Sequence, residues 1–235
     1  MSKLTEIWAK ICRKWMKIRL RPIHVLCFHH VSEENDAETM SPGDWMQIDE
    51  YKKSILNLQK EGFTFISLSE ANKKNAKDLI RCHKYIVITF DDGYATLKEI
   101  LPWLEEQQIP VTLFVNGKYL DGVSYRENPK EKYLTRDELY ALMSPLVEIG
   151  SHGWEHKNAH KISEQEFEDI VVRNIAYLSN HPRFIPFHAY TWGRHNQMTD
   201  DILKKYHVVP VLMDGLKNYN DDRVVHRELL ELMEI

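Results

Sequence analysis

The sequence predicts a single α/β domain built around a parallel sheet, either a barrel or a doubly wound sheet. Seven apolar segments rich in β-branched residues alternate with amphipathic segments, which is the order typical of such folds. The 235 residues, 43% of them hydrophobic, suffice for one sizeable core, and the chain shows no internal repeat or linker. Seven units rather than eight predict a barrel that is irregular or incompletely closed.

The expected elements follow one another regularly along the chain. Seven segments have the character of strands: 24–30, 64–68, 85–90, 111–115, 146–152, 184–190 and 208–213. Amphipathic or capped segments predict helices over 48–61, from about 96 to 108, from a capping box at 135–138, and over 163–179. The segment 117–132 is rich in charge and turn formers, which indicates a long loop, and a helix is expected over 228–235.

Local signals mark three of these helix boundaries. Gly62 is expected to stop the helix that starts at residue 48, since glycine is favoured just past a helix end. Ser69 is expected to cap a short helix after the second strand. Ser163 and Glu166 stand at capping-box spacing and open the longest helix.

Residues 1–22 are interpreted as a basic amphipathic helix that precedes the α/β domain. Lys and Arg outnumber acidic residues there by seven to one, and no apolar run is long enough for a secretion signal. Such a helix either lies on an anionic membrane surface or packs its aromatic side chains onto the domain. We therefore expect a cytoplasmic protein, with peripheral membrane contact through residues 1–21 as one alternative.

Composition excludes several classes of function. The formal net charge of −4 shows no basic excess, so nucleic acid is not an expected partner. Cys12, Cys27 and Cys82 are too few and too scattered for a disulfide framework or a cysteine-based zinc site. No segment approaches the roughly 20 apolar residues of a membrane span.

One strand candidate ends at two adjacent carboxylates. The uninterrupted apolar run over 85–90 is typical of a strand buried on both faces, and Asp91, Asp92 and Gly93 follow it. In α/β folds, the carboxyl ends of the strands carry the chemistry. Side chains alternate along a strand, so both carboxylates point the same way only if the backbone turns, as Gly93 permits. An ordinary polar turn is the alternative interpretation.

A histidine pair follows another strand candidate. His152 ends the strand over 146–152 and His156 follows it, and the carboxyl ends of parallel strands share one edge of a sheet. Two imidazoles and one carboxylate make three protein ligands, which leaves positions open for water or substrate, as in a catalytic metal site. The second carboxylate is then available as a general base. The sequence therefore predicts a metal-dependent hydrolytic site.

These motifs resemble those of the polysaccharide deacetylases, a carbohydrate esterase family with the chitooligosaccharide-deacetylase homology domain. The specific matches are Thr89-Phe90-Asp91-Asp92-Gly93 and His152-x-x-x-His156. Two further segments are similar to family signatures: Phe28-His29-His30-Val31 and Ala189-Tyr190-Thr191-Trp192-Gly193-Arg194. The resemblance covers about residues 24–227, and it implies an incomplete (β/α)7 barrel with a catalytic domain over 23–235.

The resemblance also implies roles for individual residues. Asp92, His152 and His156 would bind the metal, Asp91 would be the base, and the backbone N–H of Trp192 would bind the oxyanion. The metal would be zinc, with cobalt, nickel, manganese and iron as alternatives. The general acid stays unassigned among five histidines: His29, His30, His188, His195 and His226.

Aromatic residues near the motifs are candidates for sugar binding. Tyr94, Trp154 and Tyr190 could stack on sugar rings, although packing in the core is the alternative for each. The expected substrate is an acetylated amino sugar, such as a lipid-linked or nucleotide-linked precursor of a surface polysaccharide. Two other hypotheses remain open: a glycan-binding protein of the same fold with impaired catalysis, favoured by Gly153 and Thr191, and a hydrolase of another amide.

Overall fold

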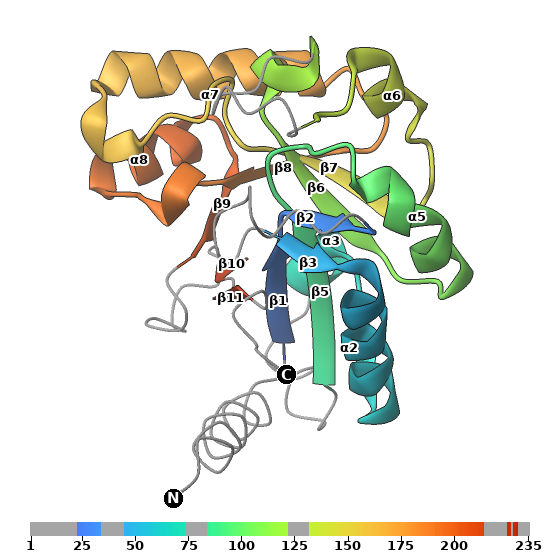
Figure 1. The fold of residues 1–235 in the computed structure, drawn as a ribbon. Coiled ribbons are helices and arrows are strands. Elements are labelled where there is room, and N and C mark those ends of the chain that lie inside the picture. The colour runs from blue at the N-terminus through green and yellow to red at the C-terminus, as the bar shows by residue number, and fades with distance from the viewer. Residues whose placement is uncertain are drawn as a thin grey trace, which may run out of the picture.

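The computed structural model describes residues 23–33, 45–73, 84–121, 132–213, 225–226 and 228–229. A curled parallel sheet lies at its centre and helices pack around it (Figure 1). This half-barrel confirms the predicted irregular (β/α)7 fold. The predicted helix over 1–22, with its proposed membrane contact, lies outside the described residues.

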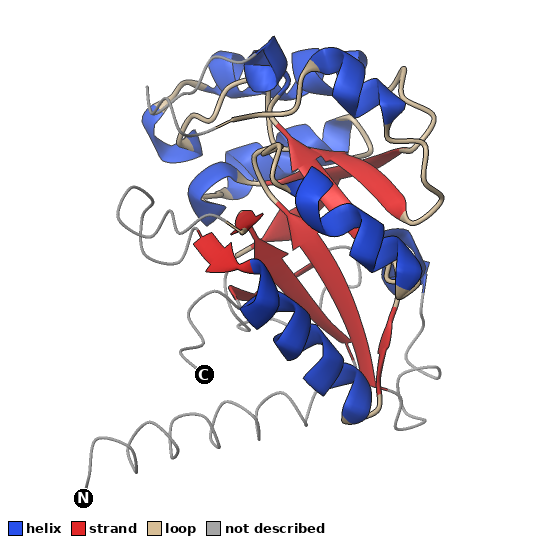
Figure 2. Cartoon of the chain, turned by 45° about the vertical axis from the view of Figure 1, so that its right-hand side comes forward, coloured by secondary structure: helices blue, strands red, loops and turns tan. Residues whose placement is uncertain are grey.

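Strands and helices alternate as expected. The strands are β1 (Ile23–Phe28), β2 (His30–Ser32), β3 (Trp45–Gln47), β4 (Phe63–Phe65), β5 (Lys84–Phe90), β6 (Val111–Val115), β7 (Val147–Ser151), β8 (Phe184–Ala189), β9 (Val209–Leu212), β10 (Val225–His226) and β11 (Glu228–Leu229). The α-helices are α2 (Ile48–Lys60), α3 (Leu68–Lys73), α5 (Leu97–Glu106), α6 (Arg136–Ala141), α7 (Glu164–Leu178) and α8 (Gln197–Lys205). Three short 3-10 helices are η1 (Gly117–Asp121), η2 (Ala159–Lys161) and η3 (Thr191–Gly193). Figure 2 shows the helices on the outside of the strands.

The main sheet is parallel throughout its described pairs. Its order is β10-β9-β8-β7-β6-β5-β1-β11, and β4 pairs with the first half of β5 while β6 pairs with the second half. Helix α2 packs against β3 and β4, α7 packs against β7, and α8 packs against β9. Since all these strands run the same way, their carboxyl ends gather at one edge of the sheet.

The two outer strands of the sheet are short and close together in sequence. β10 pairs with β9, whereas β11 pairs with β1, so the segment that contains them links the two edges of the curled sheet. The helix predicted over 228–235 is therefore wrong for Glu228 and Leu229, while 230–235 lie outside the described residues. Backbone groups along the edge of β1 pair with these two residues, and this tertiary pairing outweighs local helix propensity.

Three other predicted segments are corrected. The short helix α3 begins at Leu68, and the hydroxyl of Ser67 rather than Ser69 accepts a hydrogen bond from the N–H of Glu70 at 3.2 Å. The segment predicted as a strand over 64–68 is also shorter, because only Phe63–Phe65 pair with β5. The loop predicted over 117–132 starts with the 3-10 helix η1, and 122–131 lie outside the described residues.

The other boundary signals are confirmed. Gly62 follows α2 with a φ of 81°, a left-handed conformation that ends the helix. Thr135 and Glu138 form both bonds of the capping box that opens α6, and the Ser163 hydroxyl accepts from the N–H of Glu166 at the start of α7. In the described part of the chain, none of the helices combines the length and apolarity needed to cross a membrane.

The two faces of the sheet pack into different hydrophobic clusters. Leu26, Ile86 and Ile88 belong to the large cluster shared with the helices. Val25 and Val87, one residue out of phase, belong to a smaller cluster inside the curl, together with Phe114, Phe187, Ala189 and Val211. This alternation predicts which residues past the strand ends point inward, and the candidate site lies there.

Candidate metal centre and active site

The chain turns sharply where β5 ends. The N–H of Asp91 donates to the carbonyl of Phe28 at 2.9 Å, so Asp91 still continues the ladder with β1. Asp92 then adopts a φ of 70° and Gly93 a φ of 84°. These two left-handed residues break the alternation of the strand, so that both buried carboxylates reach the same region, as the sequence predicts.

His152 is held in one orientation at the end of β7. Its Nδ1 lies 2.7 Å from the carbonyl oxygen of Ala189, and its backbone N–H donates to Val115 at 3.0 Å. A carbonyl only accepts, so Nδ1 carries a proton, and in the neutral tautomer the lone pair is on Nε2. This is the arrangement in which a histidine offers Nε2 to a metal.

The residue after His152 must be small and left-handed. Gly153 has a φ of 82°, and a Cβ built on it would lie 2.9 Å from Cγ2 of Ile170. The side-chain amide of Asn116 donates to the carbonyls of both His152 and Gly153, at 2.6 and 3.0 Å. The turn between the two histidines is thus fixed by backbone conformation and by hydrogen bonds from Asn116, the residue after β6.

His156 returns to the site after this turn. Its N–H donates to the hydroxyl of Tyr119 at 3.2 Å, and its ring lies 5.2 Å from the ring of His152. Burial lowers the pKa of His156 to about 4, although the negative charge of Asp92 acts to raise that pKa. The ring is therefore neutral at pH 7, and its lone pair is available to a cation.

Three ligand atoms converge between β5 and β7. Oδ1 of Asp92 lies 3.3 Å from Nε2 of His152 and 3.3 Å from Nε2 of His156. This buried oxygen makes no hydrogen bond of acceptable geometry within the described part of the chain. Burial alone would raise the pKa of Asp92, but His156 and His152 outweigh it and hold the pKa well below its usual range.

This donor set fits a divalent cation. Protonated His156 lowers the pKa of Asp92 in acid, but this ring is neutral at pH 7. A cation bound by all three atoms would then supply the positive charge that offsets the desolvation of the carboxylate. The three groups lie within 4.8 Å of one another, as the ligands of one ion must. The structure thus brings together Asp92, His152 and His156, the three residues that the sequence predicts as ligands.

Asp91 lies beside the three ligand atoms rather than among them. Its Oδ2 is 3.8 Å from Nε2 of His152, and its side chain is 5% exposed. A second carboxylate at this distance is near enough to act on a water molecule held at the centre. The role of base that the family resemblance implies for Asp91 stays a prediction.

A buried polar network supports the centre from behind. The hydroxyl of Ser151 accepts hydrogen bonds from the N–H of Gly153 and the side-chain amide of Asn174, at 3.2 and 2.9 Å. Nδ1 of His188 lies 3.1 Å from the same hydroxyl. Sequence reasoning did not find this network. The available signal was Asn174, a polar residue among the buried apolar positions of α7.

The aromatic residues differ in what they offer to a substrate. Tyr94 and Tyr190 are buried, so neither ring presents a face to a sugar, and any effect on binding must be indirect. Trp154 is half-buried, and the guanidinium of Arg173 lies 4.0 Å from its ring centroid. Trp192 is 57% exposed, and its ring lies 5.1 Å from that of His156. Sequence reasoning had considered only the backbone of Trp192.

The chain just after β8 brings Trp192 to the centre. Residues 191–193 form η3, and Trp192 itself has a φ of 59°. A left-handed tryptophan is unusual and costs about 1 kcal/mol or more, so the surrounding contacts must hold it there. Such strain is concentrated at functional sites, and here the strained residue has its ring beside that of His156.

The structure places the histidines that could act as general acid in different surroundings. His30 lies against Tyr94, with ring centroids 3.6 Å apart and the rings tilted by 35°, and His195 contacts Asp200. His188 contacts the supporting network, and the side chain of His226 lies outside the described part. His29 has a ring nitrogen within 4.8 Å of a carboxylate oxygen of Asp91, which puts it next to the centre.

A comparison with family models decides the family. The model for the polysaccharide deacetylases matches residues 80–211, more than half of the chain. The chain belongs to the polysaccharide deacetylase family. The matched segment contains Asp91, Asp92, His152, His156 and Trp192.

Individual relatives of the family are distant in sequence. YxkH from Bacillus subtilis (strain 168), itself assigned provisionally to the polysaccharide deacetylases, is 21% identical over 193 residues. The match covers 79% of this chain and only 62% of YxkH, so the chain spans about three fifths of this relative.

Two solved structures of deacetylases have a similar fold. A de-N-acetylase from Aggregatibacter actinomycetemcomitans has a TM-score of 0.75 at 18% identity, with 91% of this chain and 96% of that chain covered. The Streptococcus pyogenes deacetylase PplD, solved in complex with acetate, has a TM-score of 0.74 at 19% identity, with 89% and 93% covered. At such low identity, these two structures establish the fold.

Proposed function

We propose that this protein is a metal-dependent hydrolase that removes N-acetyl groups from an acetylated amino sugar. The observation that carries the proposal is the convergence of Oδ1 of Asp92 with Nε2 of His152 and Nε2 of His156. The family, and relatives whose names include a de-N-acetylase and a deacetylase bound to acetate, support the same chemistry.

Three protein ligands would leave coordination positions of a bound cation open for water and substrate. A divalent cation bound there would lower the pKa of a coordinated water molecule and polarise the acetamide carbonyl. One carboxylate and two imidazoles suit zinc, and they also accept cobalt, nickel, manganese or iron. Ala189 and Asn116 keep His152 oriented for this role through the hydrogen bonds described above.

Asp91 takes the proton of the attacking water. Its carboxylate lies beside the ligand atoms and is nearly buried, so it is positioned to act as a general base. The backbone N–H of Trp192 stabilises the oxyanion of the tetrahedral intermediate, since η3 carries that residue next to His156.

His29 is the best candidate for the general acid. An amine leaves poorly unless it is protonated, and His29 is partly exposed near the end of β1, close to Asp91. A base just after β5 and an acid just after the neighbouring strand β1 can then serve the two proton transfers of amide hydrolysis.

The proposed substrate is a class of acetylated sugars rather than one compound. Trp192 is 57% exposed and its ring lies 5.1 Å from that of His156, so it is suited to stacking on a sugar ring. We retain a lipid-linked or nucleotide-linked precursor of a surface polysaccharide as the proposed substrate. Peripheral membrane contact through residues 1–21 and a cytoplasmic location belong to the same proposal, and vesicle binding with and without these residues tests the contact.

Acetate release tests the function. Purified protein should contain about one equivalent of transition metal and should release acetate from acetylated glucosamine oligomers. Chelation should stop the release, and added zinc or cobalt should restore it. Bound metal without acetate release from any acetylated sugar would contradict the proposal and favour a glycan-binding protein. Release of another product from cyclic imides or ureides would favour a different amidase.

A further inference from the structure

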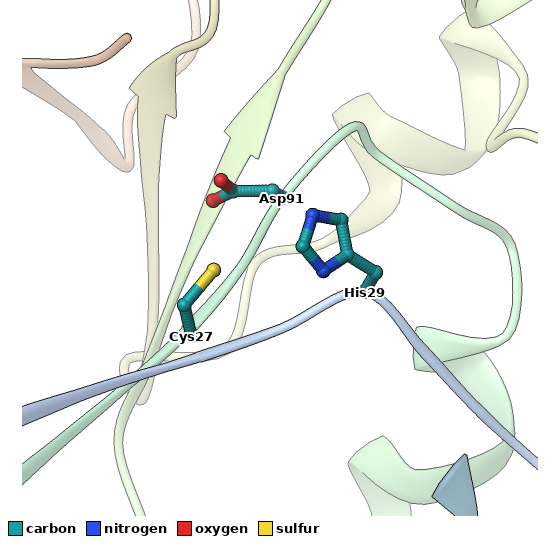
Figure 3. A group of neighbouring side chains, drawn as sticks. All are labelled: Cys27, His29 and Asp91. Atoms are coloured by element: carbon teal, nitrogen blue, oxygen red, sulfur yellow. The ribbon is translucent and has the colours of Figure 1, made fainter. Parts of the chain in front are cut away.

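A second group of metal-ligand side chains lies next to the candidate centre. The sulfur of Cys27, a ring nitrogen of His29 and a carboxylate oxygen of Asp91 all lie within 4.8 Å of one another. Figure 3 shows the three side chains facing a common space between β1 and the end of β5.

Strand register brings this group together. β1 and β5 pair with Cys27 opposite Thr89 and Phe28 opposite Phe90, and the N–H of Asp91 extends the ladder to Phe28. Residues two apart on a strand share a face, so Cys27 lies on the inner face with Val25, and His29 follows it in the same phase. Asp91 is on that face because it follows Val87 by four residues.

The side-chain chemistry selects a particular class of cation. A thiolate is a soft ligand, and with imidazole and carboxylate it favours zinc, cadmium or cobalt over magnesium or calcium. Cys27 is buried with 0% exposure, and its thiol contacts the carbonyl of Phe28 at a sulfur–oxygen distance of 3.9 Å, which is a weak interaction. His29 is partly exposed, so an ion can reach the group from solvent.

We propose that Cys27, His29 and Asp91 form a second site, for a thiophilic divalent cation, and that its occupancy inhibits the enzyme. On binding, the thiol proton passes to solvent as the sulfur–metal bond forms, with no change of oxidation state. The bound cation engages the lone pairs of Asp91 and His29, so neither can transfer a proton. The inhibition rests on the proposed function, whereas the binding does not.

Cobalt titration tests the binding directly. Chelator-treated protein should take up two equivalents of Co²⁺ and show thiolate-to-cobalt charge-transfer absorption. Cys27→Ser and Cys27→Ala should bind one equivalent without that absorption, and the affinity at the second site should fall at least about 100-fold, since loss of a direct ligand costs no less than loss of a supporting one. Cys82→Ser, the matched control, should keep the absorption. Asp92→Asn should keep it too, since Asp92 belongs to the other group.

Absence of the thiolate absorption from wild-type protein at saturating Co²⁺, or its persistence in both Cys27 variants, would overturn the site. Thermal unfolding of each variant checks that it is folded. Inhibition is tested with excess Cd²⁺ in the acetate assay, where Cys27→Ser should raise the inhibitory concentration about 100-fold with activity at one equivalent of zinc unchanged. Equal inhibition of both proteins would overturn the inhibitory role. If no acetate is released by any form, the cobalt titration still decides the site, so the two failures are distinguishable.

Discussion

The two groups of ligand side chains at the carboxyl edge of the sheet are assembled in different ways. Cys27, His29 and Asp91 come together because two adjacent strands pair in register. Asp92, His152 and His156 come together because the chain leaves its strands through left-handed residues, Asp92 and Gly153 among them. The first group is therefore a consequence of the ladder, whereas the second depends on particular turns and the hydrogen bonds that hold them.

The largest expected effect is the loss of activity on substitution of Asp92, which belongs to only one of the two groups. Asp92→Asn removes one anionic ligand of the proposed catalytic cation. Because that cation contributes several kcal/mol to transition-state stabilisation, kcat/KM for acetate release should fall by about 1000-fold or more. Metal content should fall with it, measured by elemental analysis after dialysis. The matched control is Asp201→Asn on the exposed side of α8, which should leave both unchanged. Full activity of Asp92→Asn would refute the ligand assignment.

The next effect distinguishes a base from a ligand. Asp91→Asn should lower kcat by about 100- to 10,000-fold, because an amide cannot accept the proton of the attacking water. The variant should nevertheless retain the catalytic metal, since Asp91 is not one of its three ligands. Metal content and kcat are measured on the same preparation, and loss of the metal together with activity would mean that Asp91 belongs to the ligand set.

A glycine comparison tests the dependence on turns. Gly153→Ala forces a Cβ into a left-handed residue and within 2.9 Å of Ile170, so it should lower the free energy of unfolding by about 2–4 kcal/mol. Metal affinity should fall about 10- to 100-fold as the histidine turn shifts. Gly62→Ala is the matched control, because Gly62 has a φ of 81° with nothing within 4 Å of its added Cβ.

Chemical denaturation with and without zinc measures both variants. Gly62→Ala should cost about 1–2 kcal/mol and leave metal affinity unchanged. Equal metal affinity in Gly153→Ala and wild type would show that the turn is not needed to hold the ligands.

The last prediction concerns the pH dependence of stability. The folded protein holds the pKa of His156 at about 4, below its ordinary value of 6.5, so the unfolded chain binds more protons between these values. Stability of the metal-free protein should therefore rise with pH across this window and be lost as pH falls from about 6.5 towards 4, by at most about 3 kcal/mol. His156→Gln should flatten this part of the profile, measured by urea denaturation. An unchanged slope would show that His156 is not the titrating group.

The fold, and the grouping of Asp92 with His152 and His156, were predictable from sequence for specific reasons. The apolar run before Asp91 and the histidine pair after the fifth strand candidate each mark a strand end, and parallel strands gather such ends at one edge. Helix boundaries at Gly62, Thr135 and Ser163 followed from local capping chemistry.

What sequence reasoning missed depends on contacts between distant segments. The pairing of Glu228 with Leu26 of β1 overrides a helical pattern, and the network of Ser151, Asn174 and His188 exists only when α7 packs on β7. The substrate-binding roles suggested for Tyr94 and Tyr190 depended on exposure, which neither ring has. The small number of cysteines led sequence reasoning to exclude Cys27 as a metal ligand. The strand register that sets Cys27 beside Asp91 cannot be read from the spacing of residues in the sequence.

The most direct test is a crystal of the protein grown with zinc and acetate, examined by anomalous scattering at the zinc edge. The account predicts a peak about 2.0–2.2 Å from the ligand atoms of Asp92, His152 and His156, with acetate beside Asp91 and the Trp192 N–H. A strong zinc peak elsewhere with none between these three side chains would contradict it.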